Sequence, residues 1–134
     1  MARHVLAVWN PEIKPDTIEL HAEKLRRAAT ARVWWARIYL GAPEKRKNAR
    51  VSLGPLEELD ALARQERLVL FVTDFSSLHA LQIDRVGDER DADDDDLPDY
   101  LRAHQLLHAF RAHDMRVVSH DRLATLTWMR ENLG

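Results

Sequence analysis

The chain has 134 residues, 46% of them hydrophobic and 31% charged, a composition that suits one folded domain spanning 1–134 and excludes global disorder. It contains no cysteine, which excludes disulfides, thiolate metal sites and a cysteine nucleophile. The formal net charge of −2 argues against bulk binding of polyanions, because nonspecific affinity for nucleic acid comes largely from phosphate contacts made by Lys and Arg.

The first predicted elements are a strand and a helix. His4–Trp9 is a short run rich in valine and leucine that stops at Asn10-Pro11, which is typical of a buried strand. Asp16 then caps a helix with an apolar stripe that reaches Ala29. We expect this helix to lie on the surface with one apolar face.

The second predicted strand carries two adjacent tryptophans. Arg32–Leu40 is dense in the aromatic and β-branched residues that pleated sheets favour. Successive side chains of a strand point to opposite faces, so Trp34 and Trp35 must diverge. We expect one of them in the core and the other facing a binding partner.

A basic segment follows this strand. Glu44–Arg50 has no apolar period and holds four cations, which are Lys45, Arg46, Lys47 and Arg50. Two interpretations stay open: a loop that is merely soluble, and an arm that contacts phosphates beside an aromatic site.

The middle of the chain predicts a helix and a hairpin. Gly54-Pro55 introduces a helix to about Glu66. Arg67–Thr73 reads as a strand covered on both faces, and Leu78–Val86 as its return strand. The turn between them, 74–77, contains Asp74, Phe75 and Ser76.

An acidic run, Asp88–Asp99, contains eight acids against one base and predicts a solvated, mobile loop; it lacks the spacing of a calcium loop. Beyond it, Leu97-Pro98-Asp99 predicts the start of a helix of about thirteen residues. Met115–Ser119 then predicts a short strand and Asp121–Leu133 a last helix. The expected fold class is α+β, a small mixed or antiparallel sheet, curved or curled into a barrel and flanked by helices.

The residues typical of catalysis do not form a known constellation. Asp74, Ser76, Ser77 and His79 lie close together in sequence, but no G-x-S-x-G elbow is present, and Asp74 and Ser76 read as turn caps. His104 and His108 stand at a spacing that could place two ligands on one helix face, without the glutamate of H-E-x-x-H. We therefore expect no enzyme, no metal and no cofactor.

The aromatic residues resemble a known family. A strand that ends in Trp-Asn-Pro, a helix, a Val-Trp-Trp-Ala-Arg-Ile strand and a Phe-Val-Thr-Asp-Phe-Ser-Ser-Leu hairpin look like the EVE domains of the PUA-like superfamily, which are relatives of YTH and ASCH domains. The resemblance covers most of the chain as an order of elements. A W-D-G-V-R-N-like segment, which EVE domains carry after the first helix, is not found.

The resemblance implies a module that reads a modified base of DNA or RNA by flipping it into an aromatic pocket. Such modules serve modification-dependent restriction or defence systems, fused to or associated with a nuclease or motor protein. By position the implied base-binding residues are Trp9, Asn10, Trp34, Trp35, Asp74, Phe75 and Ser76, and the implied phosphate-binding residues are Arg37, Lys45, Arg46, Lys47 and Arg50.

Two other functions stay open. One is a protein-interaction or regulatory module that uses exposed tryptophans in an oligomer. The other is a small enzyme that acts on a nucleotide. No apolar run approaches the roughly 20 residues of a membrane span, and no signal peptide precedes the first strand, so we expect a cytoplasmic protein without a membrane partner.

Overall fold

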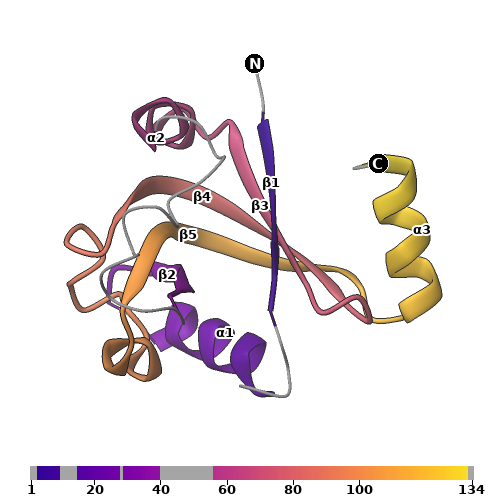
Figure 1. Ribbon diagram of the computed structural model, residues 1–134, viewed down its shortest axis with the longest axis horizontal. Coiled ribbons are helices and arrows are strands. Elements are labelled where there is room, and N and C mark those ends of the chain that lie inside the picture. The colour runs from indigo at the N-terminus through magenta and orange to yellow at the C-terminus, as the bar shows by residue number, and fades with distance from the viewer. Residues whose placement is uncertain (1–2, 10–14, 28, 40–55, 133–134) are drawn as a thin grey trace.

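The computed structural model describes residues 3–9, 15–27, 29–39 and 56–132. Helices and strands follow one another in nearly the expected order (Figure 1). They are β1 (Arg3–Val8), α1 (Thr17–Arg27), β2 (Val33–Ile38), α2 (Leu56–Arg64), β3 (Leu68–Thr73), β4 (Leu78–Asp88), the short 3-10 helix η2 (Asp99–Ala103), β5 (Leu106–Ser119) and α3 (Arg122–Asn132).

The strands form one mixed sheet in the order β1-β3-β4-β5-β2. β1 runs parallel to β3, and the other three pairs are antiparallel. The predicted β3–β4 hairpin is confirmed, with Leu68 opposite Ile83 and Thr73 opposite Leu78. The α+β class and the mixed sheet are therefore as expected.

The sheet is strongly curled. Its main core draws buried side chains from every strand, from Val5 on β1 to Trp35 on β2. Five flat strands about 4.8 Å apart would hold the two edge strands about 19 Å from each other. Yet the rings of Trp9, directly after β1, and Trp35 on β2 have their centroids only 6.2 Å apart. The two edges therefore turn toward one another around a shared core.

The helices divide between the two faces of the curled sheet. Ile18 of α1 and Leu59 of α2 pack against the main core on the concave face. Trp128 and Met129 of α3 pack on the convex face, against a separate cluster that contains Phe71. In Figure 1, α3 lies at the right-hand end of the long β4–β5 pair, apart from α1 and α2.

The prediction of a helix of about thirteen residues after Pro98 is wrong. Only η2 is helical there, and Leu106 already begins the fourteen-residue strand β5. Leu106–Phe110 is buried throughout, because β5 pairs with β2 on one side and with β4 on the other. The predicted strand Met115–Ser119 is the last part of β5.

The acidic run is also more ordered than expected. Asp94 Oδ1 accepts a hydrogen bond from Trp34 Nε1 at 3.0 Å and another from the Asp96 amide at 2.9 Å. Ala92 and Leu97 are buried beneath the segment. Only some of its acids are solvated as predicted, among them Asp93 and Asp99. The carboxylates hold the segment over Trp34 instead of forming a free loop.

Candidate functional site

The paired tryptophans of β2 point to opposite faces, as predicted, but both are buried. Trp34 is fully buried in a convex-face cluster with Leu97 and Leu101, while Trp35 is 7% exposed in the main core. The expectation that one of the pair faces outward is therefore wrong. The acidic segment covers Trp34, and the curl of the sheet covers Trp35.

Trp35 belongs to a continuous row of six aromatic and imidazole rings. Neighbouring centroids in this ring row lie 4.5 to 6.3 Å apart. In order its members are Tyr100, His21, Trp35, Trp9, His79 and His120. The row leads from the covered core to solvent, because Trp35 is buried, Trp9 is partly exposed and His120 is exposed.

The outer end of the ring row contains unpaired polar atoms. Trp9 Nε1 and His79 Nδ1 are buried and have no hydrogen-bond partner among the described residues. Their rings are neighbours, with centroids 6.3 Å apart. A buried donor or acceptor without a partner is costly and is rare in native proteins, so two on adjacent rings mark this end of the row as a candidate binding site.

An apolar side chain lies next to these atoms. Val117 on β5 is directly opposite His79 on β4, and opposing residues of an antiparallel pair share one face of the sheet. The side chain of Val117 is apolar, and 48% of it is exposed. The outer end of the row therefore combines two ring faces, an exposed apolar surface and two unpaired nitrogens.

The β3–β4 turn brings further predicted residues beside Trp9. The Trp9 amide donates to the Thr73 carbonyl at 3.1 Å, and the Phe75 amide donates to Thr73 Oγ1 at 2.9 Å. Phe75 has a left-handed backbone, with φ of 72°, and its side chain is 41% exposed. Left-handed backbone is uncommon for an aromatic residue and is found at functional sites, where it presents a side chain to a ligand.

Asp74 acts as a turn cap, which was the simpler of the interpretations for it. Its Oδ1 accepts hydrogen bonds from the Ser76 and Ser77 amides at 2.9 and 2.8 Å. Burial alone would raise the pKa of Asp74, but these bonds outweigh burial and hold that pKa below its ordinary range. Asp74 and Ser76 thus fix the turn that presents Phe75.

His21 is a member of the ring row that the sequence did not single out. It is fully buried on α1, and its Nδ1 donates to the Thr17 carbonyl at 2.8 Å. Burial lowers the pKa of His21 to about 4, although the Thr17 and Trp34 backbones favour the charged form. His21 Nε2 lacks good hydrogen-bond geometry to any described residue. The inner part of the row is therefore uncharged at neutral pH.

The other predicted site residues are placed only in part. Arg37 is exposed on β2, on the same face as Trp35 by strand alternation. The remaining predicted contacts lie outside the described residues; they are Asn10, Lys45, Arg46, Lys47 and Arg50.

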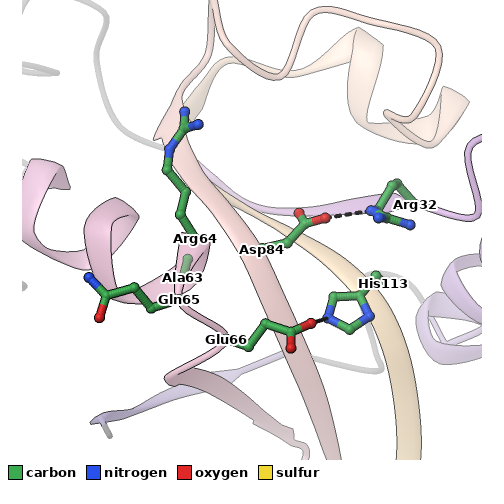
Figure 2. A pocket seen from close by; sticks show the side chains of 7 residues that line it. All are labelled: Arg32, Ala63, Arg64, Gln65, Glu66, Asp84 and His113. Carbon is green, nitrogen blue, oxygen red and sulfur yellow. Dashed lines mark hydrogen bonds and ion pairs between the residues drawn. The ribbon is translucent and has the colours of Figure 1, made fainter. Parts of the chain in front are cut away.

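A hollow of about 560 Å³ lies beside the end of α2 and holds polar side chains (Figure 2). Asp84 and His113 line it from positions where the β4–β5 register shifts. Its two carboxylates already have partners: Asp84 pairs with Arg32 and with Arg111, and Glu66 Oε1 lies 3.3 Å from His113 Nε2. Because both carboxylates already have partners, the hollow is a weaker candidate than the ring row.

The helical spacing of His104 and His108 does not bring their side chains together. His104 is exposed after η2, whereas His108 lies on β5, so the two do not share a helix face. Within the described residues, no three side chains of the metal-binding types come together. No helix in the described ranges is long and apolar enough to cross a membrane.

The chain was compared with known protein families, curated proteins and solved structures. No family model, no curated protein and no solved structure matches the chain.

Proposed function

We propose that this domain is a non-enzymatic recognition module that binds a nucleobase, held outside its stack, at the outer end of the ring row. One observation carries the proposal: the adjacent rings of Trp9 and His79 each bury a nitrogen without a partner among the described residues. Both nitrogens are covered in the free protein, so a base reaches them only by displacing the side chains that cover them. Its edge then supplies donors and acceptors for these atoms, and a base is flat enough to lie against rings.

The surroundings of these two rings support a planar ligand. The exposed ring of His120, the neighbour of His79, and the partly exposed ring of Trp9 offer faces on which a base can stack, and Phe75 is exposed on the adjoining β3–β4 turn. Stacking of a base on an aromatic side chain contributes about 1–3 kcal/mol. Arg37 and the basic segment Glu44–Arg50 would contact phosphates on either side of the base.

The resemblance to EVE domains extends this proposal. On that basis the fold is a PUA-like one, the base is a modified base of DNA or RNA, and the domain is the specificity module of a cytoplasmic restriction or defence system that includes a nuclease or motor protein. The curled sheet supports a PUA-like relationship without identifying it. The ring row replaces Trp34 as the element that would hold the base, because Trp34 is covered.

A second candidate function is protein interaction, favoured by a different surface. β1 is an edge strand in the sheet order, and its Leu6 and Val8 are 42% and 55% exposed. Exposed apolar residues on a sheet edge favour pairing with another chain. All four tryptophans lie within the described ranges and none of them is exposed, so tryptophans do not supply this interaction surface.

The test is a titration of the protein with methylated, hydroxymethylated and unmodified oligonucleotides, single-stranded and duplex, followed by tryptophan fluorescence. We expect at least one of them to bind at low salt, with an affinity that falls as salt rises. Trp9→Ala should weaken that binding by about tenfold or more, because it removes a stacking face and a donor.

Trp128→Ala is the matched control, since Trp128 is also partly buried but packs on Phe71 at the convex face. It should leave the affinity unchanged. No binding of any oligonucleotide at low salt would rule out the proposed function. Equal loss of affinity in both variants would show that Trp9 acts only through stability.

A further inference from the structure

The two unpaired nitrogens at the outer end of the ring row differ in kind. Trp9 Nε1 carries a hydrogen and can only donate. A neutral histidine has one donor nitrogen and one acceptor nitrogen. The pair Trp9 and His79 therefore defines which hydrogen-bond pattern a ligand must present.

We infer that His79 is the specificity-determining residue of the proposed site: Trp9 donates to an acceptor on the ligand, while neutral His79 accepts at Nδ1 from an adjacent donor. The ligand class is an uncharged planar ring with neighbouring donor and acceptor atoms on one edge, such as the base-pairing edge of a nucleobase. This inference rests on the proposed function.

The acceptor role of Nδ1 follows from its surroundings. His79 is 5% exposed, and no described residue offers an acceptor to a hydrogen on Nδ1. The tautomer with hydrogen on Nε2 is the more stable form of neutral histidine, and no described residue pairs with Nδ1 to reverse that preference. Nδ1 consequently presents a lone pair.

The charge state of His79 agrees with this role. Burial, and then the nearby ring of His120, lower the pKa of His79 below its ordinary value, while Asp74 and Glu19 raise it by less. The groups that act on His79 thus come from the β3–β4 turn, from α1 and from the residue after β5. The net effect keeps the imidazole neutral at pH 7.

Anions do not match this pattern. A phosphate or carboxylate oxygen can accept from Trp9 Nε1 but has no hydrogen for His79 Nδ1, where two lone pairs would face each other. The site would therefore take the base and leave the phosphates outside. Acid should reverse this preference, because a proton on Nδ1 converts the acceptor into a second donor.

The test measures the affinity for the tightest-binding oligonucleotide of the titration at about pH 8 and about pH 5, a range that spans the titration of histidine. We expect the affinity of the unaltered protein to be lower at about pH 5 than at about pH 8, because a proton on Nδ1 removes the acceptor. His79→Gln retains an acceptor oxygen that does not titrate in this range, so its affinity should stay constant. His104→Gln, at an exposed histidine outside the row, should behave like the unaltered protein.

The long-range ¹H–¹⁵N spectrum of the histidine rings gives a reading that does not depend on the variant. We expect Nδ1 of His79 to be unprotonated at about pH 8, both free and bound. A protonated Nδ1, or an affinity that falls equally in His79→Gln, would overturn the inference and leave the base-binding proposal standing. Absence of binding at the higher pH would overturn both.

Discussion

His21 couples the stability of the protein to pH through a single buried ring. Its folded-state pKa of about 4 lies below the ordinary value of 6.5, so the unfolded chain takes up a proton at a higher pH than the folded chain. The stabilisation is complete above about pH 6.5 and is lost as the pH falls toward about 4. The shift corresponds to about 3 kcal/mol.

His21→Phe keeps a ring against Trp35 but cannot titrate. We expect its free energy of unfolding, measured by urea denaturation, to fall between pH 7 and pH 4 by about 3 kcal/mol less than that of the unaltered protein. His104→Gln changes an exposed histidine and should keep the full dependence. Parallel curves for His21→Phe and the unaltered protein would show that His21 titrates normally.

At the scale of elements, the end of α2 stores backbone strain. The Arg67 amide donates to the Leu62 carbonyl at 2.9 Å and the Glu66 amide to Ala63 at 2.9 Å, which closes the helix around a left-handed residue. That residue is Glu66, with φ of 59°, where glycine is usual. Its side chain lies 3.3 Å from His113 across the polar hollow, a contact with ion-pair distance but without hydrogen-bond alignment.

Glu66→Gly should raise the free energy of unfolding by about 0.5–1 kcal/mol, because relief of the left-handed strain exceeds the loss of the exposed Glu66–His113 contact. Gln65→Gly is the matched control, since Gln65 is exposed and its φ is not positive. It should lower the free energy of unfolding by about 0.5–1 kcal/mol through added freedom of the unfolded chain. A loss of stability in Glu66→Gly would mean that the His113 contact outweighs the strain.

β5 shows why one element could not be identified from its sequence. Leu101, His104, His108 and Ala112 recur at helical spacing, and Pro98 is a good helix start. The same segment contains Leu106–Phe110, an apolar run that suits a buried strand equally well. Pairing with β2 and β4 decides between the two, and that pairing involves residues far away in the chain.

For the whole molecule, local pattern predicted most elements but not their arrangement. The β3–β4 hairpin was predictable because its strands are neighbours in sequence and joined by a capped turn. The parallel β1–β3 pair and the outer position of β2 depend on long-range contacts. The ring row was hidden for the same reason, since its rings come from separate segments, and no pattern in the sequence singled out His21.

The curl of the sheet predicts how far the effect of a core change will spread. Trp35 lies in a core shared by all five strands, whereas Trp128 packs in a convex-face cluster with β3 and β4. Trp35→Ala should therefore lower the free energy of unfolding by about 3–5 kcal/mol and speed amide hydrogen exchange in every strand. Trp128→Ala should cost less, because its ring is only partly buried, and should speed exchange chiefly in α3. Faster exchange confined to β2 in Trp35→Ala would contradict a core that joins both edges of the sheet.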